Sequence, residues 1–238
     1  RSVRARVARS NAASSVRPAQ RARCAASPYG SDTMLGSMAP IRKPLVCIVT
    51  PALADANNGN WQTARRWSRL LASHYRVALL RQWPDAAMTE RPAALIALHA
   101  RRSAASIAAW AAADGHAPLV VVLTGTDLYR DIAIDADAQR SIGLAHRLVV
   151  LQARGPLALP EHLRARCRVV FQSTPARAAL PRPSGFLRAV MVGHLRDEKA
   201  PQTLFEAARL MDPQEGIRID HMGAALDPRL LSPADGGG

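Results

Sequence analysis

Residues 94–127, with the sequence ALIALHARRSAASIAAWAAADGHAPLVVVLTGTD, decide the fold. The stretch begins and ends with apolar runs, at 94–98 and 119–123, which are typical of strands buried on both faces of a parallel sheet. Ser103 is a candidate N-cap for a helix between the two runs. Its apolar face is formed by Ile107, Trp110 and Ala111. A strand, a helix and a second strand in this order indicate an α/β fold with a parallel sheet.

The same alternation continues on both sides of this stretch. Asn- and Gly-containing sequence after the first strand leads into an amphipathic helix around Trp61 and Trp67. A further helix is predicted around 156–164. The other predicted strands of this region are 45–50, 76–80, 148–151 and 169–171. The pattern predicts a doubly wound, Rossmann-like α/β domain over residues 41–173.

A second, shorter α/β unit is predicted after a Pro-rich linker at 174–185. Residues 186–238 contain apolar runs at 187–192 and 217–222, and Pro201 opens a helix between them. These roughly 50 residues form only a β-α-β unit, whereas an independent α/β domain needs on the order of 100. We expect an incomplete second domain, from a truncated or frameshifted product.

Residues 1–40 differ from the rest of the chain in composition. They are rich in Arg and Ser and lack apolar periodicity, so we expect a disordered extension without a core. Two interpretations remain open. The segment is either a transit peptide or upstream sequence translated from a misplaced start, with Met34 or Met38 as the natural beginning.

The composition argues against several classes of protein. The net charge of +14 suggests nucleic acid, but only 4% of the residues are aromatic, which leaves few side chains on which bases stack. The three cysteines show no CxxC or His-spaced pattern, so we expect no metal site and a reducing, cytoplasmic compartment. The sequence has no apolar run of about 18 residues, so no transmembrane segment is expected.

Small and polar residues follow several of the predicted strands. Ligands of doubly wound sheets bind beyond the carboxyl ends of the strands, so these loops are the candidate site. They contain Gly59 and Asn60 after the first strand, His99, Arg101 and Arg102 after the third, Thr124, Gly125, Thr126 and Asp127 after the fourth, and Gly193, Arg196 and Lys199 after the first strand of the second unit.

Each loop has a functional and a structural interpretation. The loop at Gly59 presents backbone amides to a phosphate, or is simply a turn. Arg101 and Arg102 beside His99 form a pocket for an anionic substrate, or they are solvated beside a buried histidine. Residues 124–127 bind sugar hydroxyls, or form a strand-to-helix turn with Asp127 as its cap.

The motifs that are absent narrow the choice further. The sequence lacks GxGxxG, Walker A and GxSxG patterns, which disfavours dinucleotide-binding enzymes, P-loop NTPases and serine hydrolases. We therefore predict no cofactor. Arg196 and Lys199 would supply positive charge to a leaving diphosphate, or belong to a solvated charged segment.

Five segments of the chain resemble GT-B glycosyltransferases, the large retaining family that uses nucleotide-sugar donors. Within this class the chain is most similar to the selenosugar synthases of selenoneine biosynthesis. The likeness extends over about 45–228 and is most specific in LHARRSAASI (98–107) and LTGTDLYR (123–130). The other segments are IVTP (48–51) with Gly59 and Asn60, VGHLRDEK (192–199) and HMGAALDP (221–228).

The resemblance implies a GT-B-like architecture, with acceptor on the first domain and nucleotide-sugar on the second. It implies transfer of a sugar from a UDP-sugar to selenophosphate. The implied catalytic residues are His99 and Asp127, and the implied substrate-binding residues are Gly59, Asn60, Arg101, Arg102, Thr124, Gly125 and Thr126. Of these, Gly59 falls in the loop that lies against the donor phosphates in that family. The implied diphosphate-binding residues are Gly193, Arg196, Lys199 and Gly223. Another small acceptor, or an inactive nucleotide-binding fragment, is the alternative.

The chain departs from the pattern of the wider family in three ways. His194 stands where that family commonly has an arginine, so the diphosphate role is assigned to Arg196. Thr124 stands where it often has a histidine, so no catalytic histidine is expected there. The carboxylate pair that holds the donor sugar and ribose in the wider family has no counterpart in this chain.

Overall fold

The computed structural model describes residues 42–55, 58–179, 181, 183–195 and 199–224. The predictions for residues 1–40, for Arg196 and for residues 225–238 lie outside these described residues. The chain divides into two compact units between Ala176 and Arg177. Each unit is described separately below.

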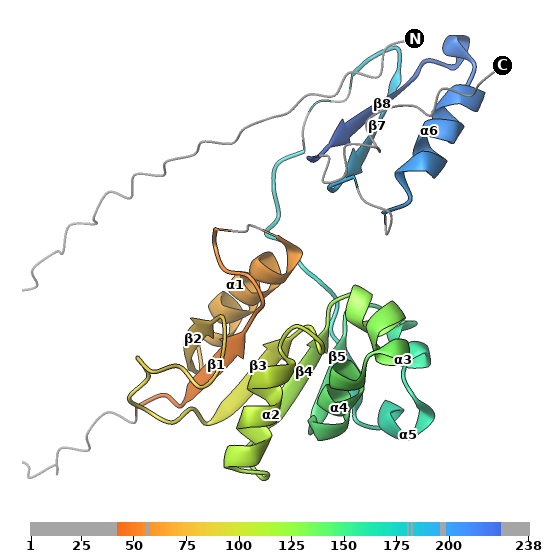
Figure 1. The fold of residues 1–238 in the computed structure, drawn as a ribbon. Helices are drawn as coiled ribbons and strands as arrows, with labels where there is room; N and C mark the ends of the chain where they lie inside the picture. The colour runs from red at the N-terminus through yellow and green to blue at the C-terminus, as the bar shows by residue number, and fades with distance from the viewer. Residues whose placement is uncertain (1–41, 56–57, 180, 182, 196–198, 225–238) are drawn as a thin grey trace, which may run out of the picture. The chain divides into compact units, whose positions relative to one another are not determined.

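The first unit is a parallel six-stranded sheet with the order β2-β1-β3-β4-β5-β6. Neighbouring strands pair in parallel throughout. The strands are β1 (Leu45–Val49), β2 (Arg76–Leu80), β3 (Ala94–Leu98), β4 (Leu119–Leu123), β5 (Arg147–Val150) and β6 (Cys167–Val169). This α/β sheet is Rossmann-like, as the sequence predicts (Figure 1).

Apolar side chains on the two faces of the sheet form two separate cores. On one face, Ile48 and Leu98 pack with Ala64 of α1 (Gly59–Leu71). On the other, strand residues pack with α2 (Ala104–Ala113) and α4 (Ala136–Leu144), where the fully buried Ile107 belongs to α2. Successive strand residues point to opposite faces, so these continuous apolar strands fill both cores.

The fifth and sixth strands are displaced from their predicted positions. The sixth was expected at 169–171, but β6 is Cys167–Val169 and Phe171 is 66% exposed. Cys167 packs into the core instead, at the outer edge of the sheet, so the apolar run 169–171 mostly extends past the paired residues. The first residue of β5, Arg147, is exposed, which is why the apolar pattern places this strand one residue late.

Two helical regions also differ from expectation. The helix predicted around 156–164 is a 3₁₀ turn (Gly155–Ala158) followed by the short α5 (Glu161–Arg164). Pro160 stands between them and has no backbone N–H to continue a helix. No helix was predicted between the fourth and fifth strands, yet α4 lies there, and the Asp135 side chain caps it by accepting the Ala138 N–H.

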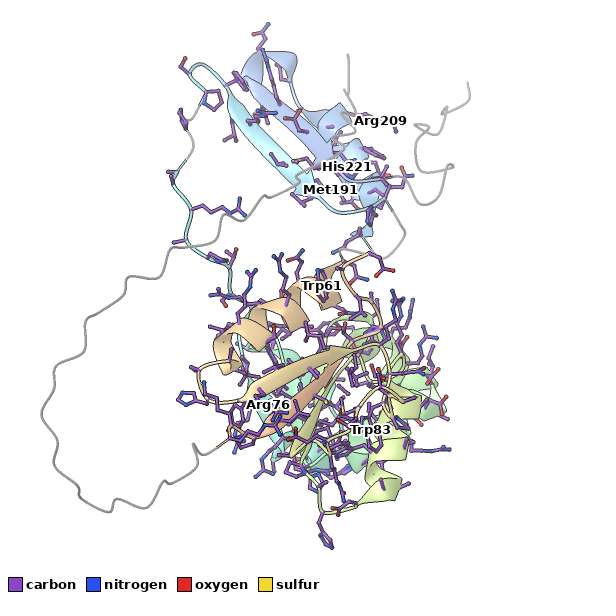
Figure 2. The ribbon with its side chains drawn as sticks, turned by 90° about the vertical axis from the view of Figure 1, so that its left-hand side faces the viewer. Trp61, Arg76, Trp83, Met191, Arg209 and His221 are labelled. Carbon is purple, nitrogen blue, oxygen red and sulfur yellow. The ribbon has the colours of Figure 1, made fainter. Side chains whose placement is uncertain are left out.

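The second unit is a β-α-β unit, as expected. It consists of β7 (Leu187–Val192), α6 (Pro201–Leu210) and β8 (Ile217–Met222), and the two strands pair in parallel. Met191 and His221 are register partners on adjacent strands, and both are labelled in Figure 2. Several apolar side chains of this unit are exposed, including Val192 at 74%.

The part of the chain that the structure describes contains no helix both long and apolar enough to span a bilayer.

Candidate functional site

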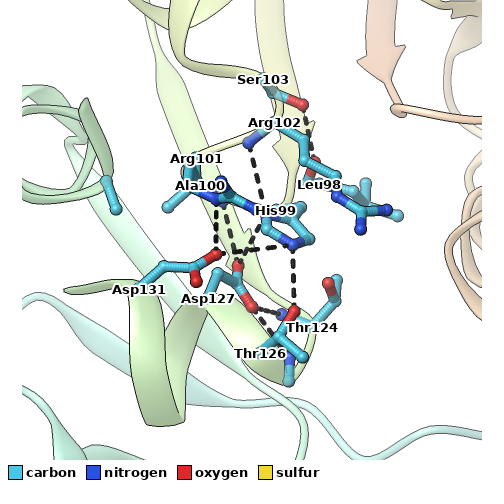
Figure 3. Close-up of polar contacts among 12 residues, drawn as sticks. Leu98, His99, Ala100, Arg101, Arg102, Ser103, Thr124, Thr126, Asp127 and Asp131 are labelled. Carbon is cyan, nitrogen blue, oxygen red and sulfur yellow. Dashed lines mark hydrogen bonds and ion pairs between the residues drawn. The ribbon is translucent and has the colours of Figure 1, made fainter. Parts of the chain in front are cut away.

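The loops that follow β3 and β4 meet beside the carboxyl ends of these two strands (Figure 3). Because β3 and β4 are parallel neighbours, their carboxyl ends lie at the same edge of the sheet. We call the side chains gathered there, His99, Arg101, Arg102, Thr126, Asp127 and Asp131, the β3–β4 cluster. The two segments with the most specific sequence resemblance, 98–107 and 123–130, contribute all of it except Asp131.

Asp127 joins the two loops. One carboxylate oxygen accepts the backbone N–H groups of Thr124 and Gly125, both at 2.9 Å, and the other accepts the Ala100 N–H at 3.0 Å. The side chain is completely buried. This geometry favours a positioning role for Asp127, which holds one loop against the other, and its expected catalytic role stays a prediction.

His99 is buried, and both of its ring nitrogens have partners. Its Nδ1 accepts the Arg102 N–H at 3.3 Å, and its Nε2 lies 3.2 Å from the Thr126 hydroxyl oxygen. Burial lowers the pKa of His99, and the nearby Asp127 carboxylate only partly opposes this effect. The ring is therefore neutral at pH 7.

The backbone of His99 adopts a conformation that few residues other than glycine adopt. Its φ angle is +72°, in the left-handed region, where histidine is among the enriched non-glycine residues. This sharp turn directly after β3 returns the chain so that the Arg102 N–H reaches the ring of His99. The turn thus holds the His99 ring between the Arg102 backbone and the Thr126 side chain.

Arg101 pairs with a carboxylate that the sequence did not single out. Its Nε donates to Asp131 at 2.9 Å, and Arg130 donates to the other oxygen of the same carboxylate at 3.0 Å. Burial raises the pKa of Asp131, but the hydrogen bonds from Arg130 and Arg101 outweigh it, so the net effect is a lowered pKa. The available signal was spacing, because Asp131 follows Asp127 by four residues, about one helical turn. Both lie in the π-helical turn η1 (Asp127–Asp131).

Arg102 differs from Arg101 in having no such partner. Its side chain is exposed, and among the described residues its guanidinium makes no hydrogen bond or ion pair. In Figure 3 the side chains of Arg101 and Arg102 leave the loop on opposite sides of the His99 ring. Arg101 is thus engaged by Asp131 and Arg102 is not. The predicted role of both arginines in binding an anionic substrate stays a prediction.

Two backbone amides of the loop after β4, those of Thr124 and Gly125, are engaged by the Asp127 carboxylate. Gly125 has a φ angle of +143°, which side-chain-bearing residues rarely adopt. Thr126 is partly exposed, and its hydroxyl makes a hydrogen bond only with His99 within the described residues.

Gly59 and Asn60 lie at the start of α1, which follows β1. The side chain of Asn58 caps this helix by accepting the Trp61 N–H at 3.1 Å. A Cβ atom built on Gly59 would meet nothing within 4 Å, so the start of α1 has room for a side chain at this position. In the described structure, no hydrogen bond or ion pair connects Gly59 or Asn60 with the β3–β4 cluster.

Gly193, Lys199 and Gly223 lie together in the second unit. A Cβ built on Gly223 would lie 1.9 Å from the carbonyl oxygen of Gly193, and one built on Gly193 would lie 3.7 Å from Cε of Lys199. Two histidines also bridge these loops. The His221 Nε2 contacts the Gly193 carbonyl at 2.7 Å, and the His194 Nδ1 accepts the Ala224 N–H at 3.1 Å.

Cysteine and metal chemistry receive no support from the described residues. Burial raises the pKa of the Cys47 thiol to about 11, so this thiol is not ionised at neutral pH. No group of three or more His, Cys, Asp or Glu side chains in the described ranges is arranged to hold a metal ion. A groove of about 240 Å³ between α2 and α4 contains none of the predicted site residues.

Comparisons with known proteins add no assignment. No protein-family model matches the chain, and no curated protein matches its sequence significantly.

Proposed function

We propose that the chain is a glycosyltransferase that transfers a sugar from a UDP-sugar to selenophosphate. The observation that carries the proposal is the meeting of residues 98–107 and 123–130, which are distant in sequence and most specific in their resemblance to selenosugar synthases. In the structure they are joined by the Asp127 bond to the Ala100 N–H and by the contact of His99 with Thr126.

The chemistry of this transfer suits the β3–β4 cluster. A lone pair of the anionic selenium attacks the anomeric carbon, a carbon–selenium bond forms, and the carbon–oxygen bond to the diphosphate breaks with its electron pair leaving on UDP. Because the nucleophile is already ionised, the step needs positioning and charge neutralisation more than proton transfer. Arg102 supplies an unpaired positive charge, and Thr126 supplies a hydroxyl.

The donor side of the proposal rests on the second unit. Gly193 and Gly223 approach each other without side chains, and Lys199 lies beside Gly193. Glycine lets backbone approach a phosphate group closely, and a lysine is a common phosphate-binding residue. We assign Lys199 to the leaving diphosphate, together with Arg196, which lies outside the described residues.

A transfer assay with the whole chain tests the proposal. A panel of UDP-sugars is supplied with selenophosphate, and UDP release and the selenium-containing sugar are measured. We expect product from at least one donor and a loss of about tenfold or more in kcat/KM for Arg102→Gln, since one charge-assisted hydrogen bond is worth about 1.5–3 kcal/mol. Arg69→Gln, in the last turn of α1, is the matched control and should retain the wild-type rate.

The outcomes separate the alternatives. Selenophosphate-dependent product supports the proposal. Transfer to other small acceptors but not to selenophosphate would mean that the chain is a glycosyltransferase with a different acceptor. Binding of UDP-sugars without any turnover would mean that it is a nucleotide-binding protein and not a transferase.

A further inference from the structure

We propose that His99 is a positioning residue that fixes the Thr126 hydroxyl as a hydrogen-bond donor to an oxyanion, with Arg102 as the charged partner of that anion. Only the identity of the oxyanion as selenophosphate rests on the proposed function. The site itself is argued from the hydrogen bonds of the β3–β4 cluster.

The direction of the hydrogen bonds around His99 follows from one backbone amide. The Arg102 N–H points at Nδ1, so Nδ1 must carry a lone pair and no proton. A neutral imidazole then carries its proton on Nε2, which faces the Thr126 hydroxyl. The His99 ring therefore donates and the Thr126 oxygen accepts.

Burial keeps the His99 ring in this neutral form by lowering its pKa, and the nearby arginines act in the same direction, against the two carboxylates. The carboxylates of Asp127 and Asp131 each lie 4.0 Å from a ring nitrogen, and Arg101 and Arg102 are the nearby cations. Both carboxylates are already engaged, Asp127 by three backbone amides and Asp131 by two guanidinium groups. Neither has to be neutralised by a charged histidine.

The proton of the Thr126 hydroxyl is left for a ligand. The hydroxyl accepts from His99 and has no other hydrogen bond among the described residues, so its own O–H is available. Thr126 is partly exposed, whereas His99 is only 2% exposed. A ligand would consequently meet Thr126, and His99 would act through it.

Arg102 lies on the Nδ1 side of the same imidazole ring. Its backbone N–H is bonded to Nδ1 of His99, and its unpaired side chain starts one imidazole ring away from Thr126. A hydroxyl donor together with an exposed, unpaired guanidinium suits a ligand that only accepts hydrogen bonds and carries negative charge, such as a phosphate-like oxyanion.

Titration of the full chain with inorganic phosphate tests the arrangement. We expect saturable binding that weakens about tenfold in Thr126→Val, because a hydrogen bond to a charged acceptor is lost. His99→Asn should weaken it to a similar extent. The Asn amide oxygen can still accept the Arg102 N–H and asparagine tolerates positive φ, but its side chain is too short to reach Thr126. His99→Gln places an amide N–H near the Nε2 position and should recover affinity to within about threefold of the wild type.

The double variant and the controls make the test specific. His99→Asn with Thr126→Val should bind phosphate no more weakly than Thr126→Val alone, since both remove the same hydrogen bond. Thr89→Val, an exposed threonine in the β2–β3 connection, should bind as the wild type does. Wild-type affinity in His99→Asn, additive losses in the double variant, or no saturable phosphate binding by the wild type would each overturn the inference.

The protonation of the ring gives a readout that does not depend on the variants folding. Ring-nitrogen chemical shifts of His99 in the wild-type chain should show the tautomer protonated on Nε2 at pH 7. Protonation on Nδ1, or on both nitrogens, would contradict the inference. The proposed function is tested separately by the transfer assay. If the phosphate titration and the tautomer agree with the inference but no sugar is transferred, the oxyanion site stands and the glycosyltransferase proposal fails.

Discussion

The two units of the chain hold their carboxyl-end loops together in different ways. In the first unit, the buried Asp127 carboxylate accepts amides from the loops after β3 and β4. In the second, the loops after β7 and β8 touch through the backbone, with the Gly223 position directly against the Gly193 carbonyl. The first junction depends on a buried carboxylate, whereas the second combines the close approach of two glycines with hydrogen bonds to the side chains of His194 and His221.

This difference shows how the same edge of a parallel sheet can be prepared for different partners. In the first unit the Asp127 carboxylate takes up the amides of Ala100, Thr124 and Gly125, and the side chains of Thr126 and Arg102 are left to contact a ligand. In the second unit, by contrast, backbone groups of the two loops bond to each other, since the Gly193 N–H donates to the Met222 carbonyl and the Leu195 N–H to the Ala224 carbonyl. The two junctions should therefore respond to opposite kinds of substitution.

The largest effect is expected from removal of the carboxylate in the first unit. Asp127→Ala leaves three backbone N–H groups without their acceptor, and we expect a loss of about 3–5 kcal/mol in the free energy of unfolding. Asp135→Ala, which removes one helix-capping acceptor from α4, should cost about 1 kcal/mol. Urea unfolding measures both, and equal losses would mean that Asp127 does not hold the loops together.

A smaller effect is expected from crowding the backbone junction of the second unit. Gly223→Ala places Cβ where the Gly193 carbonyl lies, so the loops must separate, at a cost of about 1–3 kcal/mol. Hydrogen exchange should accelerate in 187–224 and stay unchanged in 42–176. Gly59→Ala is the control, since its Cβ meets open space. Unchanged exchange in Gly223→Ala would show that the loops are not held by this contact.

The mildest effect concerns the pH dependence of the first unit. The folded-state pKa of His99 lies below its unfolded value of about 6.5, so below that pH the unfolded chain binds a proton that the folded chain does not. Stability should therefore fall as the pH decreases through about 6.5 toward the folded pKa. Unfolding measured between pH 7.5 and 5 should show this slope reduced in His99→Asn and retained in the exposed control His116→Asn. A slope identical in wild type and His99→Asn would contradict the shifted pKa.

The fold was largely predictable because its strands are short, apolar and buried on both faces. The pattern located β2, β3, β4, β7 and β8 at their observed residues. It misplaced the edge strand β6, because only Cys167 of that strand is buried and the apolar run lies further along the chain. It missed α4, because the apolar stripe of this helix is weak. In such places packing against neighbours, which local sequence does not contain, decides the structure.

The sequence predicted which loops meet at the candidate site, but it did not predict Asp131 or the partners of the individual side chains. The positions after β3 and β4 follow from the rule for parallel sheets, and His99, Thr126 and Asp127 do meet there. The opposite directions of Arg101 and Arg102 depend on the positive φ of His99 and on Asp131, a residue 30 positions from Arg101. The φ angle has no signature in the sequence, and the four-residue spacing of Asp127 and Asp131 does not tell which arginine Asp131 pairs with.

Backbone amide shifts during a titration of the isotopically labelled chain with inorganic phosphate test the central claim most directly. If the carboxyl ends of β3 and β4 form one oxyanion site, saturable shifts should concentrate in residues 99–103 and 124–127 and disappear in the Arg102→Gln chain. Shifts that do not saturate, or that spread evenly over exposed arginines such as Arg69 and Arg140, would contradict it.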